Sequence, residues 1–157
     1  MELTLEKLHE LPLEKRKEIA KTSSDPTVLD LLSADNDYFV CTYVAENSNS
    51  NINTLIKLLQ NSNLLVRRAL ANNPNANEYL LSILALDVNW QVKANVARNV
   101  NTTELLLNQL SSDSSIFVRM CVAKNPHTPK CTLAKLFYDN SALVRDCAKL
   151  EIARRNF

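Results

Sequence analysis

Apolar residues recur along this chain at a fixed interval of 26 residues. The clearest row contains Val40, Val66, Val92, Val118 and Val144. Two leucine rows keep the same interval: Leu29, Leu55, Leu81, Leu107 and Leu133, and Leu32, Leu58, Leu84, Leu110 and Leu136. Leucines three residues apart lie on one side of a helix, and a helix of about ten residues is not stable alone. The pattern therefore predicts short helices that pack on their neighbours and share a buried leucine interior.

Each repeat carries a second helix, on which the valine lies. In the clearest repeat Phe117, Val118, Cys121 and Val122 fall at positions i, i+1, i+4 and i+5, which is a helical stripe. An acidic residue or asparagine precedes each valine by five residues, at Asp35, Asn61, Asp87, Asp113 and Asp139. We expect the carboxylates of Asp87, Asp113 and Asp139 to cap the free amide groups at the start of the helix.

An asparagine follows each valine-bearing helix, at Asn47, Asn73, Asn99 and Asn125, and Pro74 and Pro126 come directly after two of them. The chain contains no glycine, and asparagine is the next most tolerant residue for a left-handed backbone. We therefore expect these asparagines to be left-handed C-terminal caps. The absence of glycine also excludes glycine-rich phosphate-binding loops.

These features predict an all-α protein, a solenoid of about twelve short helices built from helical hairpins. The whole chain, 1–157, is expected to be one domain. Residues 1–39 form a degenerate N-terminal capping region, with a helix over 1–11 that Pro12 ends and a second helix over 13–21. The regular repeats are 40–65, 66–91, 92–117 and 118–143. Residues 144–157 form a C-terminal capping helix that reaches about Arg155, because no Asn-Pro pair stops it.

Composition indicates a soluble protein and an uneven charge. Hydrophobic residues make up 46% of the chain and charged residues 22%, as in globular and repeat proteins. No apolar run approaches the roughly 20 residues that span a bilayer, and the first residues are acidic, unlike a secretory signal. We expect a cytoplasmic protein with no membrane association. Residues 1–63 carry ten acidic and six basic side chains, a net −4, whereas residues 64–157 carry seven and twelve, a net +5.

No set of residues marks a catalytic or metal site. Cys41, Cys121, Cys131 and Cys147 show no Cys-x-x-Cys spacing, and we expect them to be small buried hydrophobes. His127 and Cys131 lie four residues apart, but two ligands are too few to indicate a metal. No Ser, Cys or Lys lies in a context that marks a nucleophile. We expect no catalytic residue, cofactor or metal site, and the protein is not predicted to be an enzyme.

Two phrases resemble the leucine-rich repeat variant family and, more loosely, HEAT repeats. The first is Asp113-x4-Val118-Arg119-x2-Val122-Ala123-x-Asn125-Pro126-x-Thr128-Pro129 and the second is Asp139-x4-Val144-Arg145. The resemblance covers residues from about 14 to 157 and implies a right-handed superhelix that acts as a binding scaffold. The interval of 26 residues is slightly longer than is usual in that family. The cysteine cluster that binds an iron–sulfur centre in its founding type has no counterpart here, so no cofactor is carried over.

A basic residue follows the repeating valine in four repeats, at Arg67, Lys93, Arg119 and Arg145. Stacked helices lie about 10 Å apart, so these residues are expected to form a ladder about 30 Å long. One interpretation is an anion-binding face for nucleic-acid phosphates, as resemblance to the HEAT-like alkylpurine DNA glycosylases implies. The other is that each cation pairs with the acidic residue of its own or a neighbouring repeat. Arg68, Arg98 and Lys124 lie further round the same helices, either as solvated surface or as part of a basic face.

Trp90 lies two residues before Val92, where the other repeats carry Tyr38, Leu64, Ile116 and Ala142. Because these equivalents are mostly apolar, packing between helices is the favoured role for Trp90, and base stacking is the alternative. The sequence as a whole predicts a noncatalytic scaffold that binds an unidentified protein partner. The alternative is a nucleic-acid-binding protein related to those glycosylases, or a remnant of such an enzyme, that uses the basic ladder of the C-terminal half.

Overall fold

The computed structural model describes residues 4–156, and over this range the protein has twelve α-helices and no strands. The prediction of an all-α fold is confirmed. Contacts divide the chain into two compact units, residues 1–76 and 77–157. Residues 1–3 and 157, which the predicted terminal helices included, lie outside the described residues.

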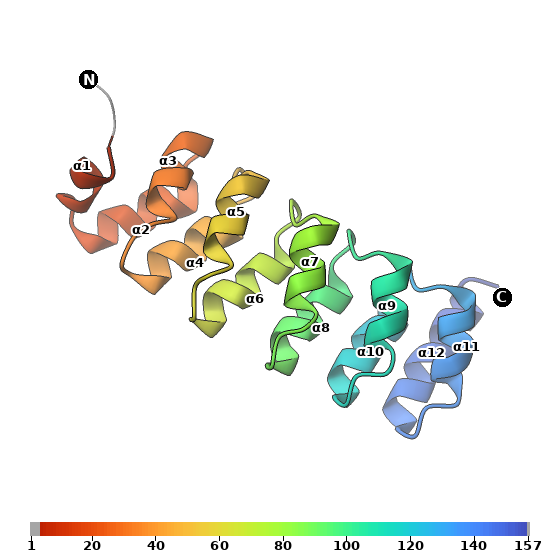
Figure 1. The fold of residues 1–157 in the computed structure, drawn as a ribbon. Coiled ribbons are helices and arrows are strands. Elements are labelled where there is room, and N and C mark those ends of the chain that lie inside the picture. Colours follow the sequence, from red (N-terminus) through yellow and green to blue (C-terminus); the bar gives the residue numbers. More distant parts are fainter. Residues whose placement is uncertain (1–3, 157) are drawn as a thin grey trace. The chain divides into compact units, whose positions relative to one another are not determined.

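The N-terminal unit is built around α4, which packs between α2 and α6 (Figure 1). Helix α3 contacts α2 and α4, α5 contacts α4 and α6, and α1 contacts α2 and α3. The bounds are α1 (Leu5–His9), α2 (Leu13–Thr22), α3 (Pro26–Leu32), α4 (Tyr38–Glu46), α5 (Ile52–Leu58) and α6 (Leu64–Asn72).

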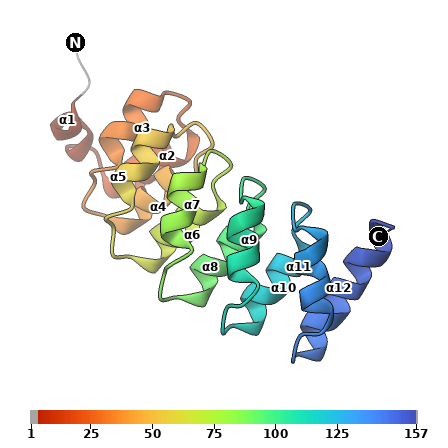
Figure 2. The same cartoon turned by 45° about the vertical axis from the view of Figure 1, so that its right-hand side comes forward.

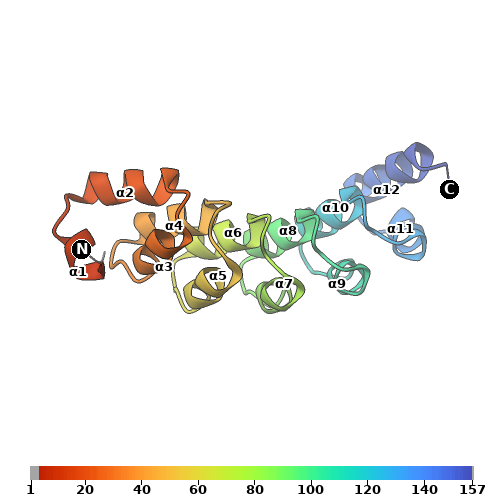
Figure 3. The same cartoon turned by 90° about the horizontal axis from the view of Figure 1, so that it is seen from above.

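The C-terminal unit has the same organisation around α10, which packs between α8 and α12. Within this unit α8, α10 and α12 lie side by side in one layer, and α7, α9 and α11 form a second layer (Figures 2 and 3). The bounds are α7 (Glu78–Leu84), α8 (Trp90–Arg98), α9 (Glu104–Leu110), α10 (Ile116–Lys124), α11 (Lys130–Phe137) and α12 (Ala142–Arg154).

The repeating apolar positions form the core of both units. All five leucines of the row that begins at Leu29 and all five valines of the row that begins at Val40 are fully buried. The leucines of the second row, which begins at Leu32, are also buried. Each unit thus gains its stability mainly from apolar side chains removed from water. The predicted leucine interior is confirmed in each unit.

The first position of the predicted apolar stripe is not part of this core. Phe39, Leu65 and Phe117 each precede a buried valine by one residue, and they are 38%, 38% and 55% exposed. One residue is about 100° of rotation round a helix. A side chain in the first turn can therefore face solvent while its neighbour is fully buried.

The acidic residues before these helices accept from the backbone N–H of the N-cap residue, whereas the prediction was that they would accept from N–H groups of the first helical turn. The N-caps of α10 and α12 are Ser115 and Ser141, two residues after Asp113 and Asp139. The aspartate carboxylates accept from the backbone N–H of these serines at 2.9 and 2.8 Å. The same bond to residue i+2 recurs at Asp35, Asn61 and Asp87. The prediction of helix capping is wrong, because these side chains instead form Asx turns that order the connection into the helix.

The asparagines after the valine-bearing helices are not left-handed. Asn47, Asn73, Asn99 and Asn125 have φ between −63° and −71°. In the described part of the chain only Asn156 has positive φ. The left-handed prediction is therefore wrong, and these residues adopt extended backbone that leaves their side chains to make the turn.

The side chains of Asn47, Asn73 and Asn125 each bond backbone carbonyls of the preceding repeat and a backbone N–H of their own connection. The Asn125 Nδ2 donates to the carbonyl oxygens of Ala97 and Asn99 at 2.8 and 3.0 Å, and its Oδ1 accepts from His127 N–H at 2.8 Å. In the N-terminal unit the Asn73 Nδ2 donates to the carbonyl oxygens of Ala45 and Asn47 at 2.7 and 3.2 Å. The asparagine amide therefore bonds carbonyls at the end of the valine-bearing helix one repeat earlier, where the last carbonyls have no partner inside that helix.

An arginine provides these bonds at the end of α12. Glu151 stands one 26-residue interval after Asn125, where an asparagine would otherwise be. Arg155 donates to the carbonyl oxygens of Asn125 and Thr128 at 2.6 and 2.8 Å and to the buried Glu151 carboxylate at 2.7 Å. The predicted long final helix is confirmed, since α12 runs to Arg154 with Arg155 as its C-cap.

Candidate functional site

Ladder cations in the C-terminal unit pair with aspartates. Arg119, on α10, donates from Nε and Nη2 to the Asp139 carboxylate at 2.7 and 2.9 Å. Its Nη1 donates to the Asp113 carbonyl oxygen at 2.8 Å. Lys93, on α8, pairs with the Asp113 carboxylate in the same way. The pairing interpretation is confirmed for Arg119 and Lys93.

These pairs are largely shielded from solvent. The Arg119 and Asp139 side chains are 13% and 8% exposed. The Arg119 hydrogen bond lowers the pKa of the Asp139 carboxyl, and the Asp139 hydrogen bond raises the pKa of the Arg119 guanidinium. Both groups are therefore charged at neutral pH, and their charges offset each other. Little of this charge remains for an external anion.

The other two ladder cations bond backbone carbonyls. Arg145 donates to the carbonyl oxygens of Asp139 and Asn140 at 2.8 and 3.1 Å. In the N-terminal unit Arg67 donates to the Ser62 carbonyl oxygen at 2.5 Å. These bonds use a guanidinium to order the connection that precedes its own helix.

The N-terminal unit contains a ladder pair that sequence reasoning missed. Arg16, on α2, donates from Nε to the buried Asp35 carboxylate at 2.8 Å. The 26-residue interval extends the basic row back to position 15, and Arg16 lies one residue after it, so the sequence did contain an indication of this pair. The Arg–Asp pair is thus a recurring structural element of the repeats.

Arg98 and Lys124 have a different environment. They occupy the last turns of α8 and α10 and are exposed. Neither has a carboxylate within ion-pair distance among residues 4–156, and Arg98 makes one side-chain bond, to Asn95 Oδ1 at 3.3 Å. Together with Phe117, Met120 and Cys121 they line a cavity of about 320 Å³, which we term the α8–α10 pocket. Of the candidate cations, the structure brings these two together at one concave surface, whereas Arg68 is half-buried on α6 in the other unit.

Trp90 lies on the same pair of helices. Its ring stacks on Phe117, with ring centroids 4.8 Å apart and an interplanar angle of 25°. This contact joins α8 to α10, so the predicted packing role is confirmed. Trp90 is nevertheless 41% exposed, and Ile116 and Leu143 are exposed at the starts of α10 and α12. Because Phe117 also lines the α8–α10 pocket, the aromatic pair forms an exposed apolar surface beside that pocket.

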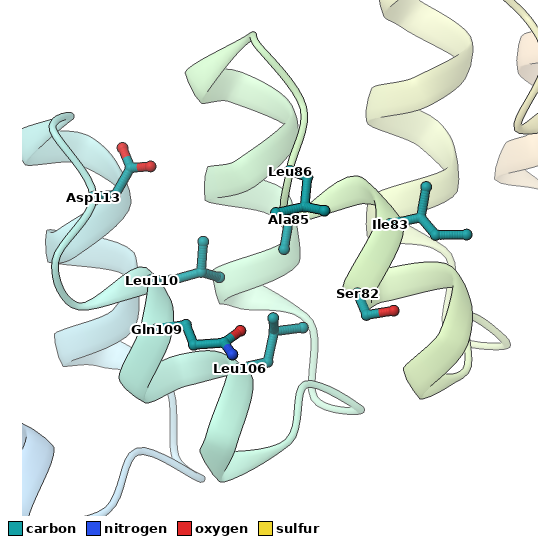
Figure 4. Close-up of a pocket in the computed structure, with 8 residues that line it drawn as sticks. All are labelled: Ser82, Ile83, Ala85, Leu86, Leu106, Gln109, Leu110 and Asp113. Carbon is teal, nitrogen blue, oxygen red and sulfur yellow. The ribbon is translucent and has the colours of Figure 1, made fainter.

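A second cavity opens in the other layer of this unit, where α7 and α9 contribute its walls (Figure 4). It measures about 500 Å³, and we term it the α7–α9 pocket. Its lining is Ser82, Ile83, Ala85, Leu86, Leu106, Gln109, Leu110 and Asp113. Leu86, in this lining, is 85% exposed, and Val88, two residues later in the chain, is 96% exposed. The sequence analysis missed this site. An indication was present, because the next repeat has Ser112 and Ser114 where this one has the apolar Leu86 and Val88.

The four cysteines differ in burial. All four cysteines are free, and Cys131 is exposed on α11, so the prediction that it is buried is wrong. Burial raises the pKa of the Cys121 thiol, although the Arg98 and Lys124 charges oppose the rise. Burial raises the pKa of Cys41 to about 11. Both thiols are therefore protonated at neutral pH, whereas nucleophilic and metal-binding cysteines react as thiolates.

Among residues 4–156, no group of three or more His, Cys, Asp or Glu side chains is placed to hold a metal ion. None of the helices from α1 to α12 has the length and apolar character that crossing a membrane requires.

Comparison with known proteins gives no relative. No protein-family model, curated protein or solved structure matches the chain.

Proposed function

We propose that this chain is a noncatalytic scaffold that binds another protein through the surface formed by α8, α10 and α12. The observation that carries the proposal is the exposed Trp90–Phe117 stack beside the α8–α10 pocket. Protein interfaces are enriched in aromatic residues, methionine and arginine, and all three border this pocket. A contiguous exposed apolar surface of this kind marks interaction sites more often than isolated surface residues do.

The proposed architecture is a right-handed solenoid of stacked helical hairpins, as in leucine-rich repeat variant and HEAT proteins. Its support is the 26-residue interval and the recurrence, in each unit, of the same packing and the same asparagine bonds. In solenoids each repeat contacts only its neighbours, and the exposed positions can vary without disturbing the stack. The repeating residues would then hold the fold, and the varying residues would select the partner.

The test is affinity purification from the native host with three forms of the protein: the parent, Trp90→Ala/Phe117→Ala, and the control Tyr79→Ala/Leu105→Ala. Tyr79 and Leu105 are exposed on α7 and α9, in the other layer. We expect a partner that the parent and the control retain and the Trp90/Phe117 variant loses. The interaction is then measured with purified components, because a direct complex must show the same loss. Equal retention by all three folded forms would overturn the proposal.

The nucleic-acid alternative has a separate test. Duplex DNA binding that falls steeply with salt, and that is lost when Arg67, Lys93, Arg119 and Arg145 are reversed in charge, would favour it. The Asp139 and Asp113 pairs argue against this reading, because they already neutralise two of the four cations.

A further inference from the structure

A pocket forms at the same repeat position in both units, but with opposite charge. In the N-terminal unit it measures about 270 Å³ and is lined by Glu46, Ala69, Asn72, Asn73 and Pro74. Glu46, Ala69 and Asn72 precede Arg98, Cys121 and Lys124 of the α8–α10 pocket by two repeat intervals each. One geometry of adjacent helices therefore produces both pockets, and the side chains at its edge determine the charge.

The charge at this position is not dictated by the helix. The last turn of a helix favours a cation because the C-terminal end of the dipole is negative. Yet the equivalents of Arg98 are Glu46, Asn72, Lys124 and Leu150, so the fold accepts an anion, an amide, a cation or an apolar side chain there. The repeat fold therefore does not require the cations Arg98 and Lys124, which are specific to the α8–α10 pocket.

We infer that the α8–α10 pocket binds an acidic segment of a partner protein, with a carboxylate between Arg98 and Lys124 and a neighbouring apolar side chain against Phe117 and Met120. This rests on the proposed scaffold function and names the chemistry of its partner. An arginine guanidinium bonds a carboxylate in a fork geometry, and the lysine ammonium adds a second charge. Met120 is flexible and adapts to differently shaped apolar groups.

The number of unpaired cations favours a protein segment over a nucleic acid. A nucleic-acid strand is held by a series of cations along its phosphates. Lys93 and Arg119, the cations nearest in sequence on the same two helices, are paired with aspartates. Two cations around one pocket of about 320 Å³ suit one or two carboxylates joined to an apolar side chain.

Trp90 provides the measurement, because it is the only tryptophan in the chain and stacks on a residue of the pocket. The probe is an end-blocked peptide of about a dozen residues in which Glu and Leu alternate, with acidic groups to match the cations. We expect saturable quenching or enhancement of Trp90 fluorescence, weakened by added salt. A peptide with Gln in place of Glu is expected to bind at least about tenfold more weakly.

Variants then assign the site. Arg98→Glu/Lys124→Glu is expected to weaken peptide binding by about tenfold or more, and Arg98→Gln/Lys124→Gln provides a milder change if the first variant folds poorly. The control Lys15→Glu/Lys21→Glu makes the same change of net charge on α2 and is expected to bind as the parent does. Circular dichroism checks that each variant is folded.

Three results would overturn the inference: no binding of the Glu-Leu peptide by the parent, equal binding of the Gln-Leu peptide, or equal binding by the folded Arg98/Lys124 variants. Tighter binding of oligo(dT) than of the peptide, lost in the same variants, would assign the pocket to nucleic acid and also overturn it. The scaffold proposal fails separately, through the Trp90/Phe117 purification test, so the two failures are distinguishable.

Discussion

The side chain of Asn125 donates a hydrogen bond of 2.8 Å to the carbonyl oxygen of Ala97, one repeat earlier. Both residues are buried, and the Ala97 carbonyl lies at the end of α8, where no later residue of that helix can bond it. Leucine burial is a non-directional contribution to the packing of neighbouring helices. The Asn125 bond adds a directional contact between two adjacent repeats.

Replacement of Asn125 by Ala is expected to lower the free energy of unfolding by about 2–3 kcal/mol, because buried carbonyl groups lose their donor. Asn125→Asp is expected to be at least as damaging, since a carboxylate cannot donate to a carbonyl. Urea denaturation followed by circular dichroism measures both. The control is Asn140→Ala, an exposed asparagine, which should change stability by less than about 0.5 kcal/mol. Equal effects at Asn125 and Asn140 would contradict the role assigned to the amide.

Arg155 offers a second test of the same principle. Arg155→Ala removes the donors to the carbonyl oxygens of Asn125 and Thr128, and we expect a loss of roughly 1–3 kcal/mol. Arg154→Ala is the matched control, because the Arg154 side chain is 67% exposed and bonds only the nearby Glu151 carboxylate. Thermal unfolding of the two variants should rank Arg155→Ala as the less stable. The opposite ranking would mean that the end of α12 is held in another way.

The Asp139–Arg119 pair predicts how stability depends on pH. The Arg119 hydrogen bond lowers the Asp139 pKa from 3.8. A carboxyl whose pKa is lowered by folding contributes stability above its unfolded pKa, about 3.9, and loses it as the pH falls through the folded value. Asp139→Asn is therefore expected to destabilise the protein by roughly 1–3 kcal/mol near neutral pH.

The difference between the parent and Asp139→Asn should shrink progressively as the pH falls below about 4. Urea denaturation at several pH values measures it. Asp146→Asn serves as a control, because the Asp146 side chain is 66% exposed and its Lys149 ion pair spans 3.7 Å. If the difference in free energy of unfolding between the parent and Asp139→Asn stays constant with pH, the pair does not contribute through ionisation.

The division of the cations into paired and available groups predicts opposite behaviour for two residues of α8. Lys93→Met leaves the Asp113 carboxylate without its cation, and we expect a loss of about 1–2 kcal/mol. Arg98→Met removes no ion pair and should change stability by less than about 0.5 kcal/mol. Urea denaturation of the two variants decides the matter, and a larger loss at Arg98 would reverse the assignment.

The interval of 26 residues predicted the helices and their buried faces because burial depends on side-chain type and helical spacing. Leu107 and Val118 are fully buried as expected. The prediction failed where one side chain chooses among several backbone partners. Asn125 was expected to use its backbone and uses its amide, and Asp113 bonds Ser115 N–H in place of the first helical turn. The Asn125 bonds depend on the position of the neighbouring repeat, which no local pattern contains. The Asp113 bond is local, but several backbone N–H groups lie within reach of its carboxylate and the residue type does not specify which one it bonds.

The candidate site was predicted only in part. The sequence analysis placed the anion-binding hypothesis on the ladder that contains Lys93 and Arg119, and left Arg98 and Lys124 as solvated surface or part of a basic face. Only the distance from each cation to an aspartate separates the paired residues from the available ones. Phe117 was expected in the core because its hydrophobicity matches that of Val118, and its place one step round the helix leaves it 55% exposed.

The most direct measurement of the binding proposal is an NMR titration of the ¹⁵N-labelled protein with the Glu-Leu peptide. We expect the largest chemical-shift changes at the Trp90 indole N–H and at the amides around Arg98, Phe117 and Lys124. These changes should saturate and fit a single dissociation constant. These shifts should be absent in the Arg98→Glu/Lys124→Glu variant. Shifts confined to the α7–α9 pocket, around Leu86 and Leu106, or none at all, would contradict the account.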